Sequence, residues 1–255
     1  MIALGPDEVH VWTASRDDAT DTEVERLRSL LTVVERRRAD RFVSKLDQRR
    51  FAVGRGRLRV LLGRYLDQSP ESIRFAHNPQ GKPSLEAGPL RFNLAHSGSL
   101  VLFALTLDRE VGVDIESIRS DFGGEAIARR FFAPAEVASL LTLPPSDRTL
   151  AFFQGWTRKE AYITAQGQGL SMPLDQFEVE IHPDRPARLI ATRPDPLEAA
   201  RWTLVELPTH PGYVAALCVR GQGWTLKRGN SSDEAVPIEI YFDPTLGPIR
   251  AIGAK

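Results

Sequence analysis

The most constraining feature of this sequence is an almost uninterrupted apolar run at residues 100–107, LVLFALTL. A run of this kind is typical of a β-strand that is buried on both faces. A polar turn, Asp108-Arg109-Glu110, separates it from a second strand pattern at residues 111–116. We therefore expect a sheet that is covered on both sides in this part of the chain.

Helix patterns precede strand patterns in both halves of the chain. In the first half we predict a strand at residues 9–13, helices at 23–41 and 49–66, and strands at 73–76, 91–95, 100–107 and 111–116. In the second half we predict helices at 125–132, 134–141 and 147–165, and strands at 177–181, 188–192, 202–206 and 213–219. This order predicts an α+β protein with two similar lobes, residues 1–109 and 110–220. Residues 221–255 are rich in glycine, proline and polar residues, which predicts a loosely packed tail.

Composition narrows the functional classes. No apolar run reaches the ~18 residues of a membrane helix, and the N-terminus lacks the pattern of a secretory signal. Cys218 is the single cysteine, so no internal disulfide can form. We expect a cytoplasmic protein without a membrane partner. The formal net charge of zero argues against a general polyanion binder.

Basic residues concentrate between positions 35 and 64, where only Glu35, Asp40 and Asp47 oppose them. The basic residues are Arg36, Arg37, Arg38, Arg41, Lys45, Arg49, Arg50, Arg55, Arg57, Arg59 and Arg64. Such a segment suits a phosphorylated ligand or an acidic protein partner, and the alternative is a solvated helix face. Aromatic residues are sparse among these arginines, which counts against nucleic-acid binding.

Two carboxylates share one face of the strand predicted at residues 111–116. Because side chains alternate along a strand, Val111, Val113 and Ile115 face the core, whereas Asp114 and Glu116 lie together on the opposite face. Neighbouring carboxylates repel each other unless a cation or a proton lies between them. The pattern fits a metal site or a solvent-facing sheet edge.

A third carboxylate, Glu160, falls within the apolar stripe of the helix predicted at residues 147–165. That stripe consists of Leu150, Phe153, Trp156 and Ile163. A carboxylate in a core needs a partner. Either a cation shared with Asp114 and Glu116 or an arginine of the other lobe would supply one. Three oxygen ligands would suit Mg²⁺.

Several short motifs occur together and in a characteristic order. They are Gly81-Lys82-Pro83, Phe92-Asn93-Leu94-Ala95-His96-Ser97, Val111-Gly112-Val113-Asp114-Ile115-Glu116, Trp156-Thr157-Arg158-Lys159-Glu160-Ala161 and Gly167-Gln168-Gly169-Leu170. Over roughly residues 9 to 220 the chain resembles the surfactin-synthetase-activating (Sfp-type) family of 4′-phosphopantetheinyl transferases. The resemblance implies two related α+β lobes, arranged with pseudo-twofold symmetry, and coenzyme A bound in the cleft between them.

The resemblance also implies an activity. An enzyme of this family transfers 4′-phosphopantetheine from coenzyme A to a serine of an apo carrier protein and releases 3′,5′-ADP. Asp114, Glu116 and Glu160 would bind Mg²⁺. Glu160, or a water that it holds, would take the serine proton, and Lys159 would contact phosphate or the leaving group. Coenzyme A would be bound by Arg38, Arg50, Lys82, His96 and Ser97.

Without the resemblance, Lys82 would be interpreted as an ordinary lysine in a turn, and His96 as a strand histidine whose ring is hydrogen-bonded within the protein. The chain departs from the family at Thr164, where a lysine usually follows one turn after the metal-binding glutamate, and at Glu35, where relatives often carry a basic residue. Thr164 motivates the alternative of a non-catalytic protein that binds coenzyme A or a carrier protein. The family resemblance further suggests a monomer.

Overall fold

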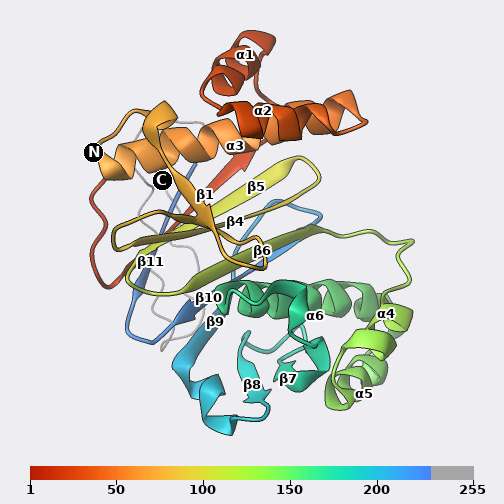
Figure 1. Cartoon of the computed structure of the whole chain (residues 1–255). Coiled ribbons are helices and arrows are strands. Elements are labelled where there is room, and N and C mark those ends of the chain that lie inside the picture. Colours follow the sequence, from red (N-terminus) through yellow and green to blue (C-terminus); the bar gives the residue numbers. More distant parts are fainter. Residues whose placement is uncertain (231–255) are drawn as a thin grey trace, which may run out of the picture.

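The computed structural model describes residues 1–230, and their strands form two main sheets (Figure 1). The first sheet has the order β11-β1-β5-β4, with bounds Thr225–Asn230, Glu8–Ser15, Leu100–Leu107 and Leu90–Ser97. The second has the order β6-β10-β9, with bounds Val111–Ser117, Tyr213–Arg220 and Trp202–Glu206. Two small hairpins pair β2 (Phe75–His77) with β3 (Pro83–Leu85), and β7 (Phe177–Val179) with β8 (Leu189–Thr192).

Helices cover the outer face of each sheet (Figure 1). The long helix α3 (Lys45–Leu66) packs on the first sheet, with α1 (Asp21–Ser29) and α2 (Val33–Asp40) beside it. The long helix α6 (Pro145–Ala165) packs on the second sheet, with α4 (Gly124–Phe131) and α5 (Pro134–Thr142) next to it. Short 3₁₀ turns occupy Pro70–Ser72, Gly169–Ser171, Leu174–Gln176 and Pro196–Arg201.

The layers meet through separate apolar clusters. One cluster joins Val9, Val11 and Leu102 of the first sheet to residues of the second sheet, such as Val113 and Leu217. Two others lie beneath the long helices, one under α3 and one under α6. The result is a helix–sheet–sheet–helix arrangement, which confirms the predicted α+β class. The boundary at residues 109/110 and the ligand cleft between lobes stay predictions.

The apolar run at residues 100–107 forms β5, as predicted. It lies between β1 and β4 in the first sheet, and all of its residues except Leu107 are buried. Its two faces contribute to different clusters, because Leu102 and Ala104 face the second sheet while Val101 and Phe103 face α3. The strand therefore has apolar cover on both sides, which explains its lack of alternation.

The single helix predicted at residues 23–41 is wrong, because the chain forms α1 and α2 with a break between them. Thr32 caps α2, and its side chain accepts from the backbone N–H of Glu35 while the Glu35 carboxylate accepts from the N–H of Thr32. This capping box starts a new helix in another direction. Val34 is consequently 74 % exposed rather than part of the apolar stripe.

The prediction of a loose tail from Gly221 is wrong for residues 225–230. These residues form β11, which pairs in parallel with β1. Trp224 and Leu226 are buried in the cluster between the sheets, so apolar packing holds the segment in place. The remainder of the predicted tail, residues 231–255, lies outside the described residues. Within residues 1–230, no helix has both the length and the apolarity to cross a membrane.

Candidate functional site

The site is built where strand β6 touches helix α6. Gly112 of β6 lies directly against the helix backbone: a Cβ at this position would be 2.1 Å from the Ala161 carbonyl oxygen and 2.4 Å from the Ala165 nitrogen. Only glycine permits this approach. Asp114 and Glu116 follow Gly112 on the strand, and Glu160 precedes Ala161 on the helix. The contact therefore sets the separation of the acids on the two elements.

The three carboxylates lie within electrostatic range of one another. Burial, and then the charges of Glu116 and Glu160, raise the pKa of Asp114 well above its usual value. Burial, and then the charge of Glu116, raise the pKa of Glu160 to about 7. The Oδ2 atom of Asp114 is buried without a hydrogen-bond partner. Asp114 is thus only partly exposed on its face of β6, and one of its carboxylate oxygens is shielded from solvent.

Glu160 has no ion pair with any arginine or lysine among the described residues, so the predicted alternative of an arginine partner is not found. A carboxylate that is partly buried beside two others strongly favours a proton or a cation as its partner. Among the described residues, no lysine or arginine forms an ion pair with any of the three acids.

Residues of β4 hold β6 in place. The Ser97 hydroxyl donates to Glu116 Oε2 at 2.9 Å and accepts from the Ser117 N–H at 3.0 Å. Deeper in the same contact, buried Asn93 accepts from the Val113 N–H at 2.7 Å. Ser97 thus orients a carboxylate of the site. The role of Asn93 was missed from sequence, although a buried amide within an apolar strand needs such a partner.

The donor set fits Mg²⁺, although it does not form a complete cage. Carboxylate oxygens are the ligands that Mg²⁺ prefers, and this ion usually takes one or two carboxylates together with waters and substrate phosphates. Throughout the described chain, no three His, Cys, Asp or Glu side chains are gathered as a ready coordination shell. The buried, unpartnered Oδ2 atom of the half-buried Asp114 is the structural observation that supports a cation here.

Lys159 lies elsewhere. Its ammonium group is completely buried and forms an ion pair with Glu136 Oε2 at 2.7 Å. It also donates to the carbonyl oxygens of Leu174 and Phe177, each at 2.7 Å. The three donors of this lysine thus all have acceptors within the protein, and a turn of about 100° per residue directs Lys159 away from the side occupied by Glu160. The contact of Lys159 with phosphate stays a prediction.

Lys82 links the first half of the chain to the end of α6. Its ammonium donates to the carbonyl oxygens of Val111 at 3.1 Å and Ala165 at 3.5 Å, and lies 3.6 Å from Glu110. In the same turn, the Asn78 side chain donates to the Gly167 carbonyl at 2.6 Å. Lys82 is therefore more than a turn lysine, since it binds the start of β6 and the end of the helix that carries Glu160.

A separate group of cations surrounds His96. This histidine is exposed, and its pKa is lowered by desolvation of part of its ring and then by the charges of Arg16 and Arg38. Arg16 is nearly buried, donates to the Gly98 carbonyl at 2.5 Å, and lies within electrostatic range of Arg50. Arg16 thus lies within electrostatic range of both His96 and Arg50, two of the predicted coenzyme A contacts. Arg16 was missed because its position just after β1 carries no motif.

Two of these arginines already have protein partners. Arg50 donates twice to Asp17, from Nε at 2.7 Å and from Nη2 at 2.5 Å. The Arg38 guanidinium lies 5.5 Å from the centre of the Phe51 ring and is otherwise exposed. Arg38 is therefore available to an anionic ligand at His96. For Arg50, such a ligand would have to compete with the carboxylate of Asp17.

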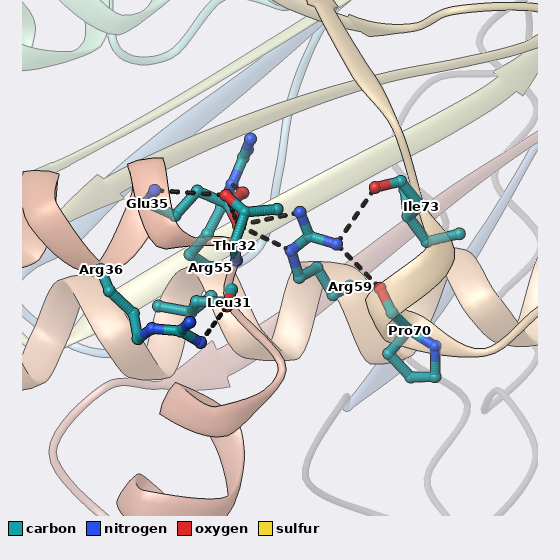
Figure 2. A network of polar contacts seen from close by, with 8 residues as sticks. All are labelled: Leu31, Thr32, Glu35, Arg36, Arg55, Arg59, Pro70 and Ile73. Carbon is teal, nitrogen blue, oxygen red and sulfur yellow. Dashed lines mark hydrogen bonds and ion pairs between the residues drawn. The ribbon is translucent and has the colours of Figure 1, made fainter.

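The structure explains why an acid, Glu35, stands at a position where relatives often carry a basic residue (Figure 2). Besides capping α2, its carboxylate accepts from Arg55 at 2.5 Å and from Arg59 Nε at 2.9 Å, and Arg59 also donates to the Pro70 and Ile73 carbonyls. Burial alone would raise the pKa of Glu35, but hydrogen bonds from Thr32 and Arg55 lower it overall. Arg55 and Arg59 are thus structural, and only part of the basic segment is free for a ligand.

Comparisons with known proteins agree with this arrangement. A family model described as the 4′-phosphopantetheinyl transferase superfamily matches residues 110–218, and one described as 4′-phosphopantetheinyl transferase, N-terminal, matches residues 12–107. The chain is 38% identical over 231 residues to the 4′-phosphopantetheinyl transferase HetI of Nostoc sp., covering 89% of this chain and 93% of that relative. It is 32% identical over 197 residues to the 4′-phosphopantetheinyl transferase Sfp of Bacillus subtilis, covering 77% and 85%.

The fold and the site define an α+β protein with an acidic centre beside a cluster of cations. Similarity over nearly the whole length of a relative shows the family. The chain belongs to the 4′-phosphopantetheinyl transferase superfamily. The relatives are named as transferases, so the alternative of a non-catalytic protein is not favoured.

Proposed function

We propose that this protein transfers 4′-phosphopantetheine from coenzyme A to a serine hydroxyl of an apo carrier protein, releasing 3′,5′-ADP. The observation that carries the proposal is that Asp114, Glu116 and Glu160 lie within electrostatic range of one another, with a buried carboxylate oxygen of Asp114 left unpartnered. Membership of the family indicates the class of reaction. The three acids indicate where a cation that stabilises the negative charge of the phosphates would bind. The carrier protein is the acceptor of the phosphopantetheine group. We also propose that the protein acts as a cytoplasmic monomer without nucleic-acid or membrane partners.

Asp114, Glu116 and Glu160 would hold Mg²⁺ at the junction of β6 and α6. When bound, Mg²⁺ would neutralise negative charge on the pyrophosphate of coenzyme A and on the leaving phosphate. Ser97 holds the Glu116 carboxylate in position, and Gly112 keeps the helix close. These two residues therefore define the geometry of the oxygen ligands before any substrate arrives.

Glu160 would take the proton of the attacking serine hydroxyl, directly or through one water. The raised pKa of this carboxyl, about 7 without a metal, supports proton exchange near neutral pH. Proton transfer to Glu160 would leave the serine oxygen free to attack the β-phosphate of coenzyme A. The bond from that phosphorus to the bridging oxygen then breaks, and 3′,5′-ADP leaves.

The cations around His96 would bind the 3′-phosphate of coenzyme A. His96, Arg38 and Arg50 come from the sequence prediction, and Arg16 is added by the structure. Lys82 and Ser97 stay proposed contacts, although each side chain already binds the protein. Guanidinium groups suit phosphate because they present several donors in one plane.

Intact-protein mass spectrometry of an apo carrier protein tests this proposal. The carrier is incubated with this protein, coenzyme A and Mg²⁺, in parallel with EDTA and with an Asp114→Asn variant. We expect a gain of one phosphopantetheine that disappears in EDTA and in the variant. An Asp121→Asn variant, which changes an exposed acid beyond β6, is the matched control and should keep activity. Absence of any gain with several carriers, despite measurable coenzyme A binding, would instead support the non-catalytic alternative.

A further inference from the structure

The ion pair between Glu136 and Lys159 is the most enclosed charge pair among the described residues. The Lys159 side chain is 0% exposed and that of Glu136 is 2% exposed. Desolvating two charges is unfavourable unless all of their hydrogen-bonding groups are satisfied. Because this ion pair is buried, it does not contribute to the solubility of the surface, and it therefore has a different role.

Both members of the pair are saturated by protein groups. Lys159 has three N–H donors, and three acceptors surround it: Glu136, the Leu174 carbonyl and the Phe177 carbonyl. Glu136 accepts in addition from the Ala133 N–H and the Val179 N–H, each at 2.8 Å. No donor of Lys159 remains for a phosphate.

The pair connects three elements of the fold. Glu136 closes the first turn of α5, Lys159 belongs to α6, and the three backbone partners at residues 174–179 lie in and before β7. The Lys159 nitrogen also lies 4.2 Å from the centre of the Phe177 ring and 5.4 Å from that of Phe132. Rotation or sliding of α6 would break all of these contacts together.

Glu160 is the next residue on the helix and faces the strand acids instead. Two constraints thus act on neighbouring residues of α6: the ion pair from one side, and the backbone contact of Gly112 with Ala161 from the other. We infer that Glu136 and Lys159 are positioning residues, which fix the rotation of α6 so that Glu160 meets Asp114 and Glu116. This inference rests on the proposed metal site, and it replaces a phosphate-binding role for Lys159.

The test compares Lys159→Met, Glu136→Gln and the double variant with the wild-type chain. Two quantities are measured without any transfer reaction: coenzyme A affinity by calorimetry in EDTA, and Mn²⁺ affinity by electron paramagnetic resonance with coenzyme A present. Glu206→Gln is the matched control, because Glu206 pairs with neighbouring Arg158 of the same helix at 2.7 Å but is 44% exposed. Circular dichroism melting shows whether each variant is folded.

For positioning residues we expect Mn²⁺ affinity to fall about tenfold or more in both single variants, as when the supporting shell of a metal site is lost. The metal-free coenzyme A affinity should stay at the wild-type value, and the two substitutions should be non-additive in the double variant. Lys159→Arg, which keeps the cation, should restore much of the Mn²⁺ affinity. Glu206→Gln should change neither quantity.

The inference is overturned if Lys159→Met weakens metal-free coenzyme A binding, because that result indicates a phosphate contact. It is equally overturned if Glu136→Gln keeps wild-type Mn²⁺ affinity, and this variant decides the question should Lys159→Met fail to fold. A wild-type chain that binds Mn²⁺ and coenzyme A but modifies no carrier refutes the proposed function alone. Absence of Mn²⁺ binding by the wild type overturns both.

Discussion

Gly112 and Ala161 are in backbone contact, and a Cβ on Gly112 would lie 2.1 Å from the Ala161 carbonyl oxygen. Real Cβ atoms do not approach an oxygen this closely, and neither the strand nor the helix backbone can move without disturbing its neighbours. Because Asp114 is two residues from Gly112 and Glu160 is next to Ala161, this contact sets the spacing of the acidic centre.

Gly112→Ala should therefore push α6 away from β6. We expect a loss of about 1–3 kcal/mol in the free energy of unfolding, typical of an overpacked core, and roughly a hundredfold loss of transfer activity through misplaced ligands. Urea unfolding and carrier modification rates measure the two effects. Gly54→Ala is the matched control, since a Cβ there would meet only Arg16 at an ordinary 3.7 Å. Equal behaviour of the two variants would contradict the role of Gly112.

The acids should make the metal-free protein less stable as the pH rises. Glu160 has a pKa of about 7 in the folded state against an ordinary 4.5, so between these values the folded state binds more protons than the unfolded state. Stability then falls with increasing pH across this window. We expect thermal melting in EDTA to show the decline for the wild type and a flatter curve for Glu160→Gln. Parallel curves for both proteins would show that Glu160 does not titrate there.

Asp17 should compete with coenzyme A for Arg50. Its carboxylate accepts twice from that guanidinium, and the pair is partly exposed. Because exposed ion pairs contribute ~0.2–1 kcal/mol, Asp17→Asn should tighten coenzyme A binding by no more than about fivefold. Binding of dephospho-coenzyme A, which lacks the 3′-phosphate, should not change. Asp21→Asn, which frees neighbouring Arg49, is the control, and equal effects on both ligands would refute the assignment.

Thr164→Lys should lower the KM for coenzyme A. Thr164 lies one turn after Glu160 on α6 and is partly exposed, so a lysine there would add positive charge near the proposed pyrophosphate position. The effect should weaken as salt increases, because charge screening reduces it. Steady-state kinetics at two ionic strengths measure it, with Thr164→Gln as a long neutral control. An equal gain with glutamine would exclude a charge effect.

Alternation along residues 111–116 correctly predicted which side chains enter the core. Val111, Val113 and Ile115 are at most 1% exposed, and Asp114 and Glu116 share the other face. The same alternation could not predict that the Oδ2 atom of Asp114 is shielded from solvent, because β6 is covered by α6, an element distant in sequence. The basic segment shows a similar limit, since the roles of Arg55 and Arg59 depend on a carboxylate from another helix.

The predicted role of Lys159 shows why adjacency in sequence is a weak guide. Lys159 and Glu160 are neighbours in one motif, but successive helix residues face directions about 100° apart. The pairing of Lys159 with Glu136 depends on how α5 packs against α6, which a periodic pattern does not encode. The break before α2, by contrast, was readable from Thr32 and Glu35, whose spacing is that of a capping box.

The position of strand β11 in the first sheet determines when that sheet can be completed during synthesis of the chain. β1 is synthesised before the other described elements of this chain, yet one of its two edges stays unpaired until residues 225–230 have been made. An open edge is a template for pairing with other chains. The first sheet thus gains its last strand only after the whole second sheet has been synthesised, so β1 has an unpaired edge throughout translation of the intervening chain.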